Sequence, residues 1–79
     1  MSPAGRTVVA SFTNAEGNHC VDIFRREDGT FGFEEYRSDP EDLMGWFPLH
    51  RYSGQAFATE ADAVARARVA VRWMAGDEP

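Results

Sequence analysis

Apolar and polar residues alternate along the first part of the chain and then follow a helical period. The period of two, with an excess of β-branched and aromatic residues, predicts strands at 7–13, 19–26, 31–37 and 46–52. A turn, NAEGN, follows the first of these segments, and Asp28-Gly29 follows the second. Because an Asp-Gly pair is the strongest short-range hairpin signal, we expect consecutive strands to pair antiparallel as a meander.

A helix is predicted from Thr59 to about Ala75. Thr59 is a suitable N-cap, and Glu60 and Asp62 stand in the first turn, where the helix dipole favours anions. Gly76 follows the last predicted residue, as is typical of a helix end. The expected core-facing stripe consists of Val64, Ala67, Val71 and Met74. The pattern therefore predicts an α+β fold, an antiparallel four-stranded β-meander with one C-terminal α-helix packed on one face.

The alternation gives the predicted sheet two apolar faces. We expect the helix to cover Val21, Ile23, Phe31, Phe33, Phe47 and Leu49. The opposite face should carry Phe24, Tyr36, Trp46, His50 and Tyr52. One helix cannot cover both faces, and large exposed apolar patches mark interaction sites. The second set is therefore a candidate interaction face.

The first strand is a second candidate surface because it begins the meander and should form an edge. Its candidate edge residues are Val8, Val9, Ala10 and Phe12, of which Val8, Ala10 and Phe12 share one side in a regular strand. No charge, Pro or Gly lies between Thr7 and Thr13 to protect this edge, whereas the other expected edge contains Pro48. We expect a two-fold homodimer, formed by pairing of this edge or by packing of the aromatic face.

The length of the chain and its cysteine content also favour self-association. A chain of 79 residues makes one domain, with residues 1–6 and 76–79 as frayed tails. So short a chain buries only about 60–65% of the surface that its unfolded state exposes, and the single Cys20 excludes an internal disulfide. A lone cysteine without a signal sequence predicts a cytoplasmic protein, and no stretch is apolar enough to span a membrane.

The charge of the chain narrows the classes of partner. The formal net charge is −5, which argues against nucleic acid as the main partner because phosphate binding needs a basic face. All eight basic residues are arginines. The absence of lysine excludes a Schiff-base lysine, a pyridoxal-phosphate site and a Walker-type phosphate lysine in this chain.

Two groups of residues resemble metal ligands only in part. His19, Cys20 and Asp22 are close in sequence, but Cys20 points away from His19 in a strand and no second cluster completes four ligands. The second group, which lacks the spacing of a calcium loop, consists of Glu34, Glu35, Asp39, Glu41 and Asp42. We therefore expect no metal and no organic cofactor.

The aromatic face also offers a candidate catalytic pair. His50 is expected across from Glu34 and near Tyr36, and a carboxylate–imidazole pair is able to act as a general base. A hydrogen-bonded histidine at a sheet surface is the plainer interpretation. The favoured hypothesis is a non-enzymatic interaction or accessory module that self-associates. The alternative is a small ligand-binding or enzymatic domain that uses His50, Glu34 and Tyr36.

Three sequence blocks also carry a resemblance to known proteins. They are DGTFGFEEY, GWFP and YSGQAFATEADAVARA, within residues 19 to 72. Together they resemble small uncharacterised bacterial proteins built as a β-meander followed by one helix, and more loosely the YegP-like domains of unknown function. The chain has one copy of the unit, whereas YegP-like proteins often have two. The resemblance implies the fold and carries no known activity.

Overall fold

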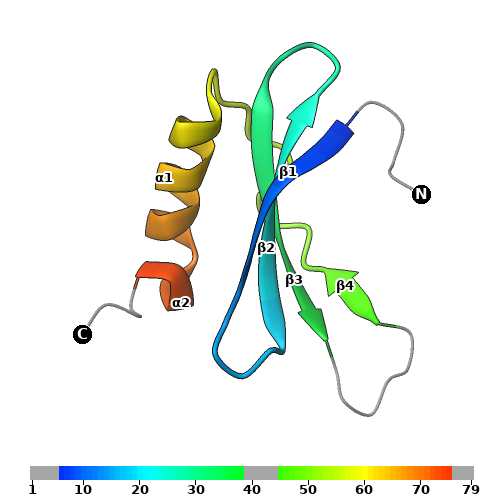
Figure 1. Ribbon diagram of the computed structural model, residues 1–79, viewed down its shortest axis with the longest axis vertical. Coiled ribbons are helices and arrows are strands. Elements are labelled where there is room, and N and C mark those ends of the chain that lie inside the picture. The colour runs from blue at the N-terminus through cyan, green and yellow to red at the C-terminus, as the bar shows by residue number, and fades with distance from the viewer. Residues whose placement is uncertain (1–5, 39–44, 76–79) are drawn as a thin grey trace.

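The computed structural model describes residues 6–38 and 45–75, which form one antiparallel sheet and a helical C-terminal segment. The elements are β1 (Arg6–Thr13), β2 (His19–Arg26), β3 (Phe31–Ser38), β4 (Trp46–Pro48), α1 (Glu60–Ala70) and α2 (Arg72–Ala75). The strands lie in the order β1-β2-β3-β4, and α1 and α2 lie together on one side of the sheet (Figure 1). The predicted α+β meander with a C-terminal helix on one face is confirmed.

The loop between β2 and β3 fixes which residues share a face. Gly29 adopts a φ of 89°, and its N–H donates to the carbonyl of Arg26 at 3.0 Å. The carboxylate of Asp28 accepts hydrogen bonds from the N–H and hydroxyl of Thr30, at 2.9 and 2.7 Å. The N–H of Arg26 donates to the carbonyl of Thr30 at 2.8 Å, which closes the loop. As a result Ile23 lies opposite Phe33 in the ladder.

The fourth strand is shorter than the expected 46–52. Pairing along β3 covers Trp46–Pro48, and one further bond runs from the N–H of Leu49 to the carbonyl of Glu35 at 2.9 Å. The chain then leaves the ladder at His50, whose φ is 56°. It returns at Phe57, which exchanges two hydrogen bonds of 2.8 Å with Phe31. The strand ends early because the positive φ at His50 breaks extended geometry.

The expected continuous helix is broken into two pieces. Thr59 caps α1 as predicted, with its hydroxyl accepting from the N–H of Asp62 at 3.1 Å. Val71 has extended angles, φ −98° and ψ 111°, so α1 ends at Ala70 and α2 begins at Arg72. The break falls at Val71, a β-branched residue of a type that loses side-chain freedom in a helix, and its side chain is buried in the core.

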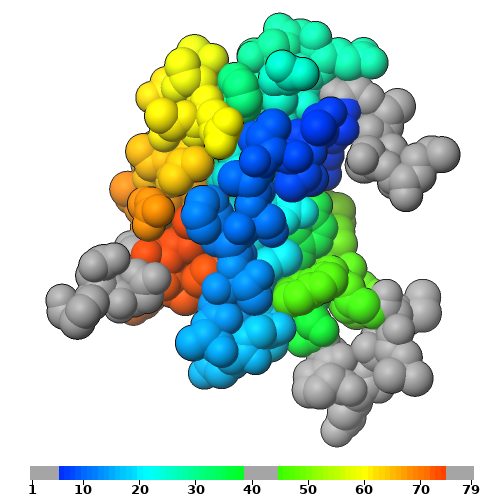
Figure 2. All heavy atoms as spheres, in the orientation of Figure 1, coloured from blue at the N-terminus to red at the C-terminus, as the bar shows by residue number. Residues whose placement is uncertain are grey.

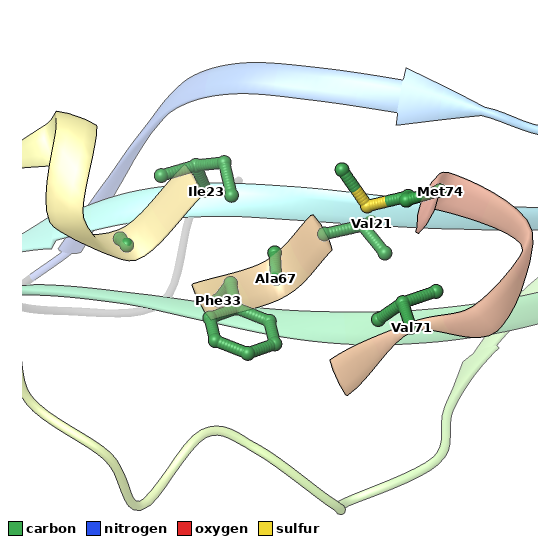
Figure 3. Packing of buried hydrophobic residues seen from close by; sticks show 7 residues of the cluster. Val21, Ile23, Phe33, Ala67, Val71 and Met74 are labelled. Atoms are coloured by element: carbon green, nitrogen blue, oxygen red, sulfur yellow. The ribbon is translucent and has the colours of Figure 1, made fainter. Parts of the chain in front are cut away.

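The core lies between the sheet and the two helices. Its buried members are Val21, Ile23, Phe33, Ala63, Ala67, Val71 and Met74. Figure 3 shows Val71 and Met74 from the helical segment directed toward Val21 and Phe33 of the sheet. The expected stripe is correct except at its start, where Ala63 is buried and Val64 is only partly buried. Small alanines in α1 allow the helix to approach the sheet closely.

A bulge in β1 corrects the expected facing of the first strand. Val8 pairs with Phe24 and Ala10 pairs with Ile23, so Val9 is an extra residue between them. Directly paired residues point to the same side of an antiparallel sheet. Ala10 therefore faces α1, and Val8 faces the other way. A regular period of two would have placed both on one side, and the extra residue is what reverses it.

Candidate functional site

Two neighbouring valines of β1 are exposed at an edge of the sheet. β1 is an edge strand of the sheet, and its residues Val8 and Val9 are 50% and 40% exposed. Helix α1 packs over β2 and β3, which leaves β1 beside the helix and not beneath it. Figure 2 shows β1 in blue along the middle of one surface of the molecule, between α1 and the β4 segment. The predicted position of this strand at an edge is confirmed.

The backbone of β1 alternates between its partner β2 and the open edge. The N–H of Asn14 donates to the carbonyl of His19 at 3.0 Å, so it points toward β2. Since alternate residues of an antiparallel strand direct their polar groups to opposite sides, Ser11 and Thr13 direct theirs outward. The hydroxyl of Ser11 donates to the carboxylate of Asp22 at 2.8 Å, which fixes its side chain. The edge therefore offers a regular ladder site around Ser11.

A shallow pocket adjoins this edge on the helix side. It has a volume of about 270 Å³ and is lined by Ser11, Phe12, Thr13, Arg68, Trp73 and Met74. The Arg68 guanidinium lies 5.7 Å from the centroid of the Phe12 ring. A strand added to β1 would place alternate side chains beside Phe12, on the rim of this pocket.

The face of the sheet turned away from α1, here called the far face, is less exposed than the sequence suggests. Phe24 pairs with Gly32 there and is only 1% exposed. The guanidinium groups of Arg6 and Arg26 lie 4.1 and 5.0 Å from the centroid of its ring. Tyr36 is partly buried, and Arg6 donates to its hydroxyl at 3.4 Å. Cation–π contacts with two arginines thus cover the Phe24 ring, which the sequence pattern predicted to be exposed.

Arg26 also fastens the segment after β4 to the sheet. Its Nη2 donates to the carbonyl of Ser53 at 2.6 Å and to that of Gln55 at 3.0 Å. A Cβ on Gly32 would lie 2.8 Å from the same Nη2 and 2.8 Å from the Phe24 ring. Gly32 is therefore the gap through which the Arg26 side chain crosses β3.

Two members of the expected interaction face lie elsewhere or alone. Tyr52 lies on the helix side, where its ring stacks on Phe33 at 4.9 Å and its hydroxyl donates to the carbonyl of Ala70 at 3.4 Å. Its placement on the far face is wrong, because the chain leaves the ladder at His50 and the alternation ends there. Trp46 is 45% exposed. With Phe24 buried and Tyr52 on the other side, the five residues do not form one contiguous aromatic patch.

Glu34 is a buried carboxylate bound to the backbone of the segment after β4. Its oxygens accept from the N–H groups of Arg51, Tyr52 and Ser53 at 3.1, 3.1 and 2.9 Å, and from its neighbour Glu35 at 2.9 Å. Burial raises the pKa of Glu34, but the hydrogen bonds from these backbone groups outweigh it and hold the pKa below its ordinary value. This carboxylate satisfies the N–H groups that leave the ladder after His50.

The candidate pair of His50 and Glu34 is not assembled as expected. His50 is exposed, and the hydrogen bonds of the Glu34 carboxylate go to backbone N–H groups. Within residues 6–38 and 45–75, no hydrogen bond or ion pair joins His50 to Glu34 or to Tyr36. Burial raises the pKa of the Tyr36 hydroxyl above its ordinary value.

A different carboxylate–imidazole pair is present on the helix side. His19 Nδ1 lies 2.9 Å from Oε2 of Glu35, and the indole N–H of Trp73 donates to the same oxygen at 3.0 Å. Glu35 is only 5% exposed. By the period of two, His19 shares a face with Val21, and Glu35 shares a face with Phe33, but no sequence motif joins the two residues. The signal was available, since Val21 lies opposite Glu35 and His19 is its diagonal neighbour.

This cluster anchors the C-terminal end of the helical segment. Trp73 belongs to α2, whereas His19 and Glu35 belong to β2 and β3. The break at Val71 precedes the turn that carries Trp73 to Glu35. Since the side chains of His19 and Trp73 both bind the Glu35 carboxylate, the simplest role of the cluster is to hold α2 against the sheet by polar contacts.

Cys20 is a buried free thiol on the far face. It lies opposite Tyr36 in the ladder. Burial, and then the carboxylates of Asp22 and Glu35, raise the pKa of the thiol to about 11. The thiolate is the nucleophilic form, so this thiol is inert at neutral pH.

The described part of the chain has no candidate metal cluster and no helix that could cross a membrane. No group of three or more His, Cys, Asp and Glu side chains in residues 6–38 and 45–75 is arranged to hold a metal ion. No helix among the same residues is long and apolar enough to cross a membrane. Asp39, Glu41 and Asp42 of the acidic candidate group lie outside the described residues.

Comparison with protein-family models, curated proteins and solved structures finds no match to this chain. The resemblance to YegP-like domains therefore stays an expectation.

Proposed function

We propose that the protein is a non-enzymatic interaction module that self-associates through the open edge of β1. The observation that carries this proposal is the exposure of Val8 and Val9, at 50% and 40%, on an eight-residue edge strand. No charged residue lies between Thr7 and Thr13 to discourage pairing. We also propose a cytoplasmic location, in keeping with its free Cys20 thiol.

Edge pairing has more support than packing of the aromatic face. Phe24 is buried by Arg6 and Arg26, and Tyr52 contributes to the helix-side core. Of the five candidate face residues, Trp46 is the large apolar side chain that remains well exposed. A single half-exposed tryptophan offers little area, and exposed apolar residues that occur singly are ordinary on protein surfaces.

The alternative function, a ligand-binding or enzymatic domain at His50, Glu34 and Tyr36, has less support. The Glu34 carboxylate is bound by backbone N–H groups, and among the described residues no hydrogen bond joins it to His50, which is exposed. A general base needs a carboxylate or imidazole within reach of a substrate proton. This arrangement supports a structural role for Glu34.

Sedimentation equilibrium of the purified chain tests the proposal. We expect a mass of two chains at micromolar concentration. Val9→Lys should shift the protein to monomer because a charge on the edge opposes pairing. Trp46→Ala should leave the dimer intact, whereas loss of the dimer in this variant would favour the aromatic face. A mass of one chain up to hundreds of micromolar would overturn self-association.

The edge itself is tested by Ser11→Pro. This change removes an N–H that points outward, so the ladder to β2 is kept while the edge loses a donor. We expect a folded monomer by circular dichroism and sedimentation. Ser11→Ala is the matched control, because it removes the same hydroxyl bond to Asp22 and leaves the backbone donor. A dimer that survives Ser11→Pro would exclude pairing through this ladder.

A further inference from the structure

The charges at the two ends of β1 differ in sign. A depression of about 200 Å³ at its N-terminal end is lined by Arg6, Thr7, Arg25, Arg26 and Glu27, so three of five residues there are basic. The turn that follows its C-terminal end contains Glu16, which is exposed. The strand between these ends is uncharged from Thr7 to Thr13. β1 is therefore a neutral strand with a basic end and an acidic end.

We propose that the partner of β1 is the β1 strand of a second copy, paired antiparallel and centred on Ser11. This inference rests on the proposed function, and it adds the orientation, the register and the contacting charges. Antiparallel pairing brings the basic end of each strand to the acidic end of the other. Parallel pairing would place like charges together. In a chain of net charge −5, this local complementarity favours one arrangement of two copies.

The register follows from which backbone groups face outward. Ser11 and Thr13 direct their N–H and C=O to the open edge, and the bulge residue Val9 is next along the strand. A centre at Ser11 pairs Ser11 with itself across the two-fold axis and brings Thr13 opposite the bulge of the other copy, which lies between Val8 and Ala10. The same centre places Phe12 opposite Ala10 of the other copy on the helix side, where the small alanine leaves room for the phenyl ring.

The charges fit this register as well. Arg6 stands five residues before Ser11 and Glu16 five residues after it. Antiparallel pairing centred on Ser11 therefore brings the Glu16 turn of one copy toward the basic depression of the other. Arg25, which is exposed at this end, is available for that contact.

Cross-linking with the shortest bismaleimide tests the register. Ser11→Cys places two thiols in one ladder pair, with Cα atoms about 5.5 Å apart. Thr13→Cys is the matched control, because its two copies stand about 13 Å apart along the strands, four residues at about 3.3 Å each. Both variants also carry Cys20→Ala, since Thr13 lies opposite Cys20 in the ladder and a thiol at position 13 could form an internal disulfide with it. We expect efficient cross-linking of Ser11→Cys and little for Thr13→Cys. Wild type should not cross-link, because Cys20 is buried and its pKa is about 11.

The outcomes separate the two proposals. Equal or reversed cross-linking of Ser11→Cys and Thr13→Cys in a protein that sediments as a dimer overturns the register and leaves self-association standing. A wild-type protein that sediments as a monomer at hundreds of micromolar overturns both proposals. The cross-linking is read together with sedimentation of the same variants, so that a cysteine that disrupts the dimer is recognised.

A charge exchange tests the orientation independently of cross-linking. Glu16→Arg and Arg25→Glu should each weaken the dimer about two- to thirtyfold, since exposed ion pairs contribute weakly and two are present per dimer. The double variant carries the opposite pair and should recover most of the affinity. If the double variant is weaker than both single variants, the two residues do not meet across the interface and the antiparallel arrangement is wrong.

Discussion

At the scale of single residues, Gly32 permits the far face to be closed by arginine. The side chain of Arg26 crosses β3 at Gly32, lies over the Phe24 ring and donates to the carbonyls of Ser53 and Gln55. Because Gly32 has no side chain, it leaves room both for the Phe24 ring and for the guanidinium group of Arg26. The far face needs no second helix to bury Phe24, because two arginines cover it.

Gly32→Ala tests this arrangement. The added Cβ would lie 2.8 Å from both Arg26 Nη2 and Phe24 Cε1, so the neighbours must shift. We expect a loss of about 1–3 kcal/mol in the free energy of unfolding, typical of overpacking, measured by chemical denaturation. Gly54→Ala is the control, since a Cβ there meets nothing within 4 Å and should change stability little. Equal stabilities for the two variants would contradict the proposed crossing.

Glu34 gives a residue-scale prediction with a pH dependence. Its backbone donors hold the pKa of the folded state below the ordinary value of 4.5. A depressed pKa contributes stability above the unfolded value, and this contribution is lost as the pH falls through the folded value. Glu34→Gln should cost about 1–3 kcal/mol at pH 7, because it weakens the acceptor of several backbone N–H groups.

The measurement is the difference in unfolding free energy between wild type and Glu34→Gln, taken from pH 7 to pH 3. We expect the difference to be largest at pH 7 and to shrink below about pH 4.5, the ordinary value for this group. Glu27→Gln, at an exposed position, controls for the general effect of removing a charge. A difference that stays constant with pH would show that Glu34 is not the group that titrates.

At the scale of elements, the sequence predicts well which strands and helices exist and in what order, but it predicts poorly where each of them ends. The strands, the Thr59 cap and the side of the sheet taken by Val21, Ile23 and Phe33 follow from local pattern. The early end of β4 comes with the positive φ of His50, and the N–H groups that follow it bond to the Glu34 carboxylate on another strand, which a local pattern does not reveal. The bulge at Val9 has no sequence mark, since Val is common in regular strands.

The candidate site was likewise predictable where it depends on strand order, and not where it depends on contacts between distant parts of the chain. The edge position of β1 depends only on strand order, and it is confirmed. The aromatic face depended on a regular period of two through Tyr52, and the positive φ of His50 ended that period. The pairing of His19 with Glu35 and Trp73 joins elements far apart in the chain, so it required both the ladder register and the break at Val71.

Two valines of the helical segment test the core assignment. Val71 is 1% exposed and Val69 is 71% exposed, although they are two residues apart. Val71→Asp would bury an unpaired charge and should cost about 3–5 kcal/mol, enough to unfold much of so small a domain. Val69→Asp adds the same charge at the surface and should melt within a few degrees of wild type. Similar melting of the two variants would mean that the helix is rotated relative to this assignment.

At the scale of the whole molecule, the small core and the open β1 edge lead to one expectation. If folding is coupled to pairing, a tenfold increase in concentration adds about 1.4 kcal/mol per dimer. An unfolding entropy of about 2.1 cal/mol/K per residue, over two chains of 79 residues, converts this to a rise in Tm of about 4 °C. Wild type should show this rise per tenfold concentration in calorimetry. Val9→Lys should melt at a fixed temperature, while Val69→Lys, a like change on the exposed side of α1, should keep the dependence. A wild-type Tm that does not change with concentration would mean that each copy folds without its partner, and pairing through β1 would then add no stability to the fold.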